Sequence, residues 1–223
     1  MPDTVQYRLT FEKTGRAIYI SHLDLMRTMQ RAFLRAGLPL AYSQGFNPHA
    51  RMRVLLPLSV GTASLCERMD VLLREELPPE ALPGRLNPCL AEGLRFLECY
   101  AGGAKPGKLK WLRVTGRLEY DGVRDLAALA EAVAAFFQRE EIVVEKKTKR
   151  GFAMTDIRPA IRSFAVLPGR GALEVDAVLS AQEPTLNPEL LPGALRQLMP
   201  ELAPDFSAFT RLEIYDAAMQ PFR

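Results

Sequence analysis

The sequence predicts an α+β protein made of two tandem ferredoxin-like halves packed together. In the first hundred residues, segments with strand and helix periodicity follow one another as strand, helix, strand, strand, helix, strand, which is the order of a ferredoxin-like unit. The pattern P-E-x-L-P-G-x-L then occurs twice, from Pro79 and from Pro188, in a chain of 223 residues. Because each copy falls where the second helix of its half is expected, we interpret the chain as a duplication.

The first half is expected to contain four strands and two helices. The strands are predicted at Tyr7–Phe11, Met52–Ser59, Glu67–Arg74 and Gly93–Tyr100, and Ala17–Ile20 is interpreted as a continuation of the first strand. The first helix is predicted to begin at Ser21, because a serine followed three residues later by Asp24 resembles a capping box, and to end at Gly37. The second helix is predicted within Pro78–Leu90.

A linker is predicted between Ala101 and Gly107, where glycine, lysine and proline follow one another, so the halves are expected at residues 1–104 and 108–223. Each half alone is small for a stable core, so we expect the two to share an interface. The second half is predicted to have strands at Lys110–Tyr120, Glu141–Lys149, Ala160–Leu167, Gly171–Ser180 and Thr210–Asp216, and helices at Asp125–Arg139 and Pro188–Met199.

Composition indicates a globular cytoplasmic protein. Hydrophobic residues make up 48% of the chain and charged residues 25%, no apolar run reaches membrane-spanning length, and the first ten residues lack the layout of a signal peptide. The three cysteines, Cys66, Cys89 and Cys99, are scattered and form no metal-binding motif. The common phosphate-loop, zinc-protease and hydrolase motifs are absent as well. We therefore predict no metal site and no cofactor.

Positive charge is concentrated between Arg16 and Arg53. This segment holds six arginines and one acid, Asp24, whereas the whole chain carries a net charge of only +3. Arginines at positions 27, 31 and 35 are four residues apart and share one face of the predicted helix. Such a row is either a solvated face or a surface that binds a polyanion. The candidate phosphate contacts here are Arg27, Arg31, Arg35 and Arg51.

The segment from Pro39 to His49 is predicted to be a loop with a binding role, because it mixes turn formers with aromatic, amide, hydroxyl and imidazole side chains. If it folds back over the helix start, His22 and His49 approach each other and become an acid–base pair or a weak metal site. The alternative is that both are ordinary polar residues, so we assign neither a catalytic role. The candidate ligand or RNA loop comprises Ser21, His22, Asp24, Tyr42, Ser43, Gln44, Phe46, Asn47 and His49.

A second basic segment lies at the end of a predicted strand. Lys146, Lys147, Lys149 and Arg150 precede Gly151 and Phe152, so cations adjoin a ring that can stack on a base. A solvated hairpin tip is the alternative interpretation. Shortly afterwards, Arg158 precedes Pro159 and is a further candidate phosphate contact, with Asp156 placed to orient its guanidinium; a structural ion pair is the alternative.

Four motifs resemble the radical SAM-linked domain family, whose function is unknown: EKTGR at 12–16, ISHLDLMR at 20–27, GLPLAYSQGFNPH at 37–49 and DIRP at 156–159. The resemblance covers essentially the whole chain, although Ala50 stands where a family copy can carry proline. It implies a bacterial accessory protein that acts with a radical SAM enzyme on RNA. No catalytic residues are established for that family, so none is carried over. The chain lacks the CxxxCxxC cluster motif, so the cluster chemistry would belong to the partner.

The leading hypothesis is therefore a non-catalytic RNA-binding accessory protein in tRNA or rRNA modification or processing. The arginine row, the Tyr42–His49 loop and the lysine-rich tip are expected to line one basic groove between the halves. Two alternatives stay open. One is a metal-independent endoribonuclease-like enzyme that uses His22 and His49, by fold analogy with CRISPR repeat-processing endoribonucleases. The other is a protein adaptor that docks on an acidic partner without nucleic acid.

Overall fold

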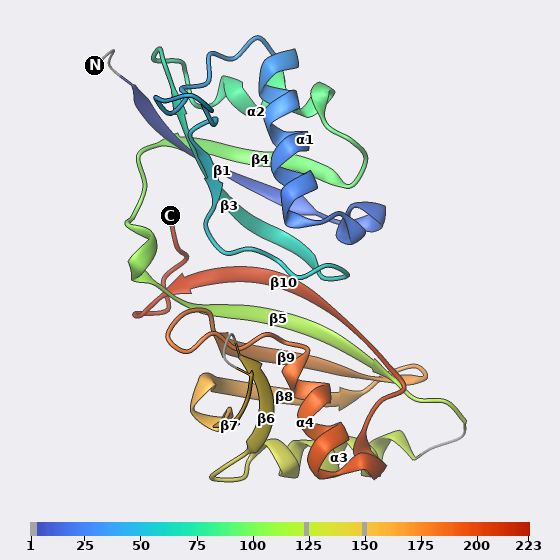
Figure 1. Cartoon of the computed structure of the whole chain (residues 1–223). Helices are drawn as coiled ribbons and strands as arrows, with labels where there is room; N and C mark the ends of the chain where they lie inside the picture. The colour runs from blue at the N-terminus through green and yellow to red at the C-terminus, as the bar shows by residue number, and fades with distance from the viewer. Residues whose placement is uncertain (1–3, 123–124, 149–150) are drawn as a thin grey trace. The chain divides into compact units, whose positions relative to one another are not determined.

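The computed structural model describes residues 4–122, 125–148 and 151–223. The chain divides into two compact units, residues 1–108 with Arg223 and residues 109–222 (Figure 1). In the described part of the chain, every helix is too short or too polar to cross a bilayer.

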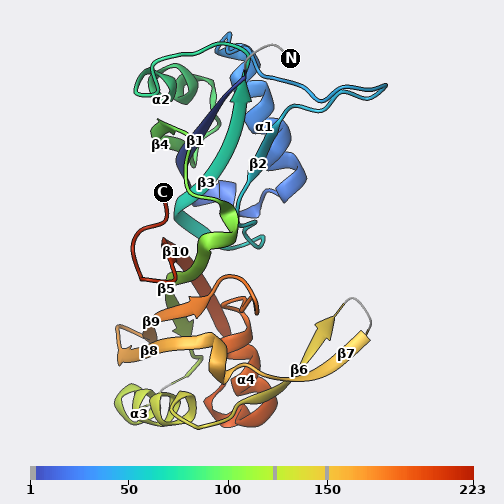
Figure 2. The same ribbon diagram turned by 90° about the vertical axis from the view of Figure 1, so that its left-hand side faces the viewer.

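The first unit has a ferredoxin-like topology, as predicted. Its elements follow the order β-α-β-β-α-β, and the strands are arranged β4-β1-β3-β2 with every neighbouring pair antiparallel (Figures 1 and 2). The bounds are β1 Val5–Lys13, α1 His22–Arg35, β2 Met52–Val54, β3 Ala63–Leu73, α2 Ala81–Leu86 and β4 Leu94–Ala101, with short 3-10 helices at η1 Gly15–Tyr19, η2 Asn87–Cys89 and η3 Pro106–Lys108.

Both helices of the first unit pack on one face of its sheet. Alternate residues of β1, among them Leu9 and Phe11, join side chains of α1 and α2 in one buried cluster. The Phe96 ring of β4 packs edge-on against Phe11 and Phe33, with ring centroids 5.9 and 6.2 Å apart. The intervening residues of the strands therefore point to the other side. We call this side the outer face.

The second unit repeats the same topology with one insertion. Its sheet has the order β10-β5-β9-β8, again antiparallel throughout, while β6 and β7 form a separate hairpin between α3 and β8 (Figure 2). The bounds are β5 Leu109–Glu119, α3 Leu126–Phe137, β6 Val143–Thr148, β7 Gly151–Asp156, η4 Arg158–Ala160, β8 Ile161–Pro168, β9 Ala172–Ser180, α4 Leu190–Leu198, η5 Pro200–Leu202 and β10 Phe206–Asp216. The two copies of P-E-x-L-P-G-x-L lead into α2 and α4, the second helix of each unit.

Two local predictions were wrong. Residues 17–20 are not strand, because Gly15–Tyr19 form the 3-10 helix η1. The Lys13 ammonium at the end of β1 donates hydrogen bonds to the carbonyls of Ile18 and Ile20, at 3.0 and 3.3 Å. The strand expected over Met52–Ser59 ends at Val54, three residues before Pro57, which has no N–H for a ladder. The strand predicted at residues 141–149 is confirmed as β6, which pairs with β7, a strand that was not predicted.

Candidate functional site

The loop after α1 is a closed hairpin. Tyr42 and Ala50 form a β-bridge, the Ser43 N–H donates to the His49 carbonyl at 2.8 Å, and the His49 N–H donates to Ser43 Oγ at 2.9 Å. Gly45 at its tip has a φ of 123°, which favours glycine. Gln44 to Pro48 are exposed, and the Phe46 ring is fully exposed. We call this segment the Tyr42–Ala50 hairpin. It presents its amide and aromatic side chains to solvent, as a binding loop would.

Backbone hydrogen bonds fix the base of the Tyr42–Ala50 hairpin beside the end of β3. The Ala41 N–H donates to Leu72 O at 2.8 Å, and the Leu72 N–H donates to Arg51 O at 2.9 Å. The Gln30 amide also donates to the Tyr42 hydroxyl at 3.5 Å. Gln30 lies eight residues, or roughly 12 Å, along α1 from His22. The hairpin is therefore anchored to the C-terminal half of α1, away from the helix start.

The residues at the helix start serve mainly to cap it. The Asp24 N–H donates to Ser21 Oγ at 3.2 Å, and the Ser21 hydroxyl donates to Asp24 Oδ2 at 2.7 Å. Arg27 pairs with the other oxygen of Asp24 at 3.0 Å. The hydrogen bond from Ser21, together with that from Arg27, lowers the pKa of the exposed Asp24 carboxyl. His22 is the first residue of α1 and is exposed. Ser21, His22 and Asp24 thus form one group, and Tyr42, Ser43 and His49 form another.

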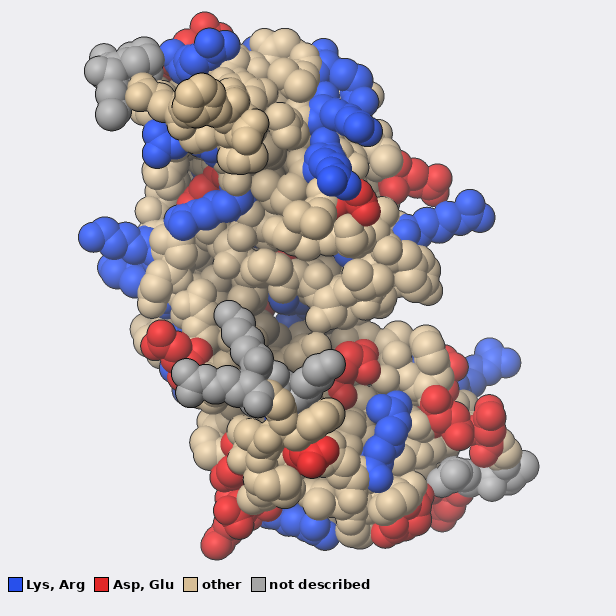
Figure 3. Space-filling view, viewed as in Figure 1, with Lys and Arg blue, Asp and Glu red and all other residues tan. Residues whose placement is uncertain are grey.

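The arginine row follows one side of α1, over which basic side chains gather in Figure 3. Its members differ in how far they are engaged. Arg27 is paired with Asp24, and Arg35 donates to the Cys89 carbonyl. Arg31 is exposed, and its side chain makes no hydrogen bond or ion pair within the described residues. The row therefore offers less unpaired charge than the sequence pattern predicts.

The outer face of the first unit gathers further arginines around one carboxylate. Asp70 on β3 lies opposite both Arg8 on β1 and Arg53 on β2. Arg8 Nε and Nη2 bind the two oxygens of Asp70 at 2.6 and 3.1 Å, and Arg53 Nη2 reaches Oδ2 at 3.3 Å. The Arg8 side chain is fully buried, whereas that of Arg53 is 60% exposed. Asp70 therefore offsets the buried cation and holds the exposed one in place.

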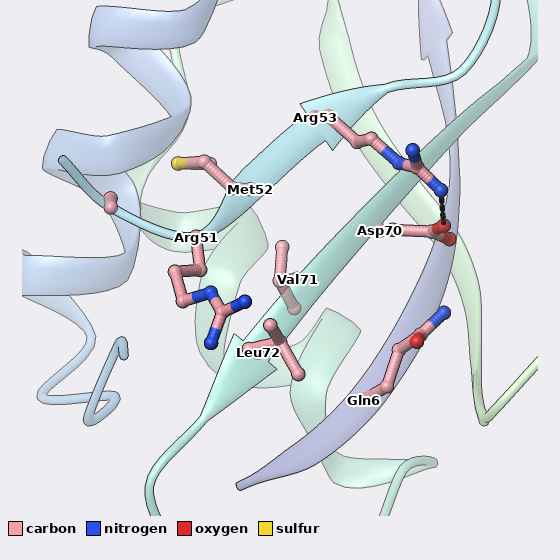
Figure 4. Close-up of a pocket in the computed structure, with 8 residues that line it drawn as sticks. Gln6, Arg51, Met52, Arg53, Asp70, Val71 and Leu72 are labelled. Atoms are coloured by element: carbon pink, nitrogen blue, oxygen red, sulfur yellow. Dashed lines mark hydrogen bonds and ion pairs between the residues drawn. The ribbon is translucent and has the colours of Figure 1, made fainter. Parts of the chain in front are cut away.

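Two pockets lie next to each other here, the first on the outer face and the second beside the end of β3, and Arg51 lines both of them. The first, which we call the Gln6 pocket, has a volume of about 300 Å³ and is lined by Gln6, Arg51, Arg53, Asp70 and Leu72 together with residues 50, 52 and 71 (Figure 4). The second, which we call the Tyr42 pocket, has a volume of about 360 Å³ and is lined by Tyr42, Ser43, Gln44, Arg51 and Arg74 together with Thr4 and Ala41.

The structure thus brings Arg51 together with the first residues of the Tyr42–Ala50 hairpin. The Arg51 and Arg74 side chains are exposed and have no hydrogen-bond or ion-pair partner in the part of the chain that the structure describes. Their guanidinium groups are free to bind an anion in or between the two pockets.

Sequence reasoning named only Tyr42, Ser43, Gln44 and Arg51 of these pockets, and among the residues it missed are Gln6, Arg53, Asp70 and Arg74. One signal was available, because Arg51 and Arg53 alternate along a strand and must point to the same face. The other three residues come from β1 and from β3 or its end. Their place beside Arg51 depends on strand pairing and register, which local periodicity does not give.

Two of the candidate phosphate contacts in the second unit, Lys146 and Arg158, have structural partners. Lys146 donates to the Thr185 carbonyl at 3.1 Å. The Arg158 guanidinium donates hydrogen bonds to the carbonyls of Arg139 and Ile161, at 3.1 and 2.8 Å. The Asp156 carboxylate accepts hydrogen bonds from the backbone N–H groups of Ile142 and Arg158. The carboxylate thus contacts the backbone of Arg158. Lys147 belongs to β6, and Lys149 and Arg150 lie outside the described residues. The groove expected between the halves stays a prediction.

The described residues contain no group of three or more His, Cys, Asp or Glu side chains that could hold a metal ion. All three cysteines are free thiols. Burial, together with the nearby Glu80 carboxylate, raises the pKa of the Cys99 thiol to about 12. A group with this pKa is a poor nucleophile at neutral pH, so Cys99 fits a structural role.

A family model described as "Uncharacterized protein conserved in bacteria (DUF2344)" matches residues 6–188. The chain belongs to this family. The DUF2344 match contains β1 from its second residue onward, α1, the Tyr42–Ala50 hairpin, β2 and β3. The pockets are therefore built almost entirely from residues within the family region.

Other comparisons add little to the DUF2344 assignment. No curated protein matches the chain. A solved structure titled as an unknown protein from Galdieria sulphuraria is 11% identical, covers 96% of this chain and 99% of its own, and has a TM-score of 0.28. A second solved structure, of Thermus thermophilus Cse3 bound to an RNA representing a pre-cleavage complex, is 16% identical. The match covers 92% of this chain and 98% of the Cse3 chain, with a TM-score of 0.21.

Proposed function

We propose that this DUF2344 protein is a non-catalytic RNA-binding accessory protein that holds RNA on the outer face of its first unit. The supporting observation is the grouping of Arg51, Arg53 and Arg74 around two pockets beside the exposed Tyr42–Ala50 hairpin. In this proposal residues 1–104 and 108–223 act as two tandem domains of a cytoplasmic protein, and the N-terminal domain carries the RNA site.

Guanidinium groups suit this role because each presents a planar set of donors that matches two phosphate oxygens. The one carboxylate in the Gln6 pocket, Asp70, is already bound by Arg8 and Arg53, so its repulsion of a phosphate is offset. The exposed Phe46 ring at the hairpin tip adds a surface on which a base can stack, at about 1–3 kcal/mol per base. The Phe46 ring and the Arg51 guanidinium thus lie within one short segment, a combination that single-strand binding uses.

Binding of a labelled tRNA and of an rRNA fragment, followed by fluorescence anisotropy, tests the proposal. We expect an affinity that falls steeply between roughly 50 and 200 mM salt, because each neutralised phosphate releases counterions. The double variant Arg51→Ala/Arg74→Ala is expected to bind more weakly and with a shallower salt slope. Arg95→Ala is the matched control, since Arg95 is an exposed arginine of the same unit on β4 that lies opposite Glu12, at the other end of β1 from Gln6 and the pockets. Failure of both RNAs to bind at low salt would refute the proposal.

The arginine row of α1 has its own test in the same assay. If Arg27 and Arg31 contact phosphates, Arg27→Ala/Arg31→Ala lowers RNA affinity beyond the Arg95→Ala control. An unchanged affinity would remove the row from the interface while leaving the outer face in place. RNA is expected to stay intact throughout. Cleavage that disappears in a His22→Ala/His49→Ala variant would instead support the endoribonuclease alternative.

We further propose that the protein works with a radical SAM enzyme. The proposal is supported by the resemblance of the motifs at 20–27 and 37–49, and by the lack of a CxxxCxxC cluster motif in this chain. Purification of the tagged protein from its own bacterium under anaerobic conditions should recover an iron–sulfur protein that mass spectrometry identifies. Recovery of that partner without RNA would favour the adaptor alternative.

A further inference from the structure

We propose that the Gln6 pocket and the adjacent Tyr42 pocket together bind one dinucleotide step of single-stranded RNA, with a nucleoside in each pocket and the linking phosphate on Arg51. This inference rests on the proposed RNA-binding function and specifies the form of RNA that the site accepts. It follows from the sizes of the two pockets, from the chemistry of their walls and from the position of the arginine that they share.

The Gln6 pocket has the size and polarity for one nucleobase. Its volume of about 300 Å³ is at the lower end of ligand pockets, which suits a single nucleoside. The side chain of Leu72 provides an apolar wall, and Gln6, Arg53 and Asp70 surround it with polar groups (Figure 4). The Gln6 amide offers both a donor and an acceptor to a base edge.

The Tyr42 pocket offers a stacking surface next to a second cation. The Tyr42 ring is 37% exposed and forms part of the wall, while its hydroxyl is held by the Gln30 amide. Because the ring is held from one edge, its face is preorganised for a base. Arg74 lines the same pocket and can bind the next phosphate along the strand.

Among the described residues Arg51 alone lines both pockets, and the backbone fixes its position. Its N–H donates to the Ala41 carbonyl at 2.8 Å, and its own carbonyl accepts from Leu72 at 2.9 Å. Its side chain stays exposed and without a partner among the described residues, whereas Arg53 is tied to Asp70. A phosphate that joins two nucleosides, one in each pocket, therefore meets the guanidinium of Arg51.

This arrangement selects single strands. In a duplex the bases are paired and stacked on both faces, so neither can enter a pocket, and only the backbone is available for contact. In a single strand the bases can separate and enter the two pockets while the phosphate between them stays on the surface.

The test compares a labelled single-stranded RNA of about eight nucleotides with a blunt RNA duplex of roughly 16 base pairs by anisotropy. We expect the single strand to bind at least about tenfold more tightly. Unlabelled dinucleoside monophosphate should displace it at concentrations where nucleoside monophosphates do not. Arg51→Ala should weaken single-strand binding about tenfold and Arg95→Ala less than about twofold.

The outcomes separate this inference from the proposed function. Equal binding of single strand and duplex, or equal effects of Arg51→Ala and Arg95→Ala, would overturn the dinucleotide site and leave general RNA binding intact. Absence of binding to either RNA would overturn both. Arg51→Lys gives a second measurement, since it keeps the charge and loses the planar donor set. Full affinity in Arg51→Lys would show that only net charge matters and would also overturn the inference.

Discussion

The Arg8–Asp70 ion pair sets the charge that the outer face presents. Asp70 offsets the charge of the buried Arg8 and still binds Arg53, so the exposed guanidinium of Arg53 is held in place. A buried arginine is costly unless a carboxylate pairs with it. The residues that support this pair therefore matter for the site although they contact no ligand.

Gly103 is one such residue. Its φ is 133°, and a Cβ atom added there would lie 2.7 Å from Cζ of Arg8, whereas a Cβ at Gly102, with a φ of 76°, would meet nothing within 4 Å. Both substitutions strain the backbone, but only Gly103→Ala also displaces a guanidinium that is buried and ion-paired. We expect Gly103→Ala to lower the free energy of unfolding by about 2 kcal/mol more than Gly102→Ala. Urea unfolding measures both, and equal losses would contradict the packing described.

Cys99 provides a chemical check on burial. At pH 8 a thiol with a pKa of about 12 is ionised in about one molecule in ten thousand, so iodoacetamide should leave Cys99 unlabelled in the folded protein. Its labelling rate should rise about tenfold for each pH unit, because only the thiolate reacts. The urea-unfolded protein is the control, in which the thiol regains its ordinary pKa and reacts quickly. Peptide mass spectrometry gives the result; rapid labelling of folded protein at pH 8 would count against it.

At the scale of elements, the start of α1 is the best-defined local prediction. Ser21 and Asp24 exchange two hydrogen bonds there. Ser21→Ala should lower the free energy of unfolding by about 1 kcal/mol, whereas Thr28→Ala in the middle of the same helix should be neutral or slightly stabilising.

The effect of Ser21→Ala should also depend on pH. The folded protein lowers the pKa of Asp24, so the stabilisation from its carboxylate is present above the ordinary carboxyl pKa and is lost as the pH falls through the lowered value. The difference between wild type and Ser21→Ala is therefore expected to shrink in acid. Thermal unfolding across this range measures it, and a difference that grows in acid would refute the assignment.

Elements with strong periodicity could be predicted, and contacts between elements could not. The alternating residues of β1 and the spaced apolar residues of α1 carry their own signal, as do the two proline-led starts of α2 and α4. The strand β7 was missed because its residues are exposed or half-buried, so no buried face marks it in the sequence. The loop residues and Arg51 could be named from the sequence, while Gln6, Asp70 and Arg74 could not, because a strand's partner is not encoded in its own alternation.

For the whole molecule, the decisive quantity is how charge is distributed. The net charge of +3 is modest, so general attraction to nucleic acid should be weak and the arginines of the first unit should dominate. Protein purified at roughly 50 mM salt should carry bound RNA and should lose that RNA at high salt. Bound RNA raises the ratio of absorbance at the nucleic-acid maximum to absorbance at the protein maximum. The Arg51→Ala/Arg74→Ala variant, purified in parallel, should carry less. Equal RNA content in both would place the binding elsewhere.

The two units are elaborated at the same point of their common topology. In the first, the Tyr42–Ala50 hairpin lies between α1 and β2; in the second, the β6–β7 hairpin lies between α3 and β8. The first connection leads into β2 and the second into β8, and each of these is the last strand in the four-strand order of its unit. Each connection also carries an exposed phenylalanine, Phe46 in the first and Phe152 in the second. A connection that precedes an edge strand can gain residues without breaking the hydrogen bonds between the inner strands of the sheet. Each of the two connections can thus lengthen independently, and we expect family members to differ most in the lengths of these connections while the eight paired strands persist.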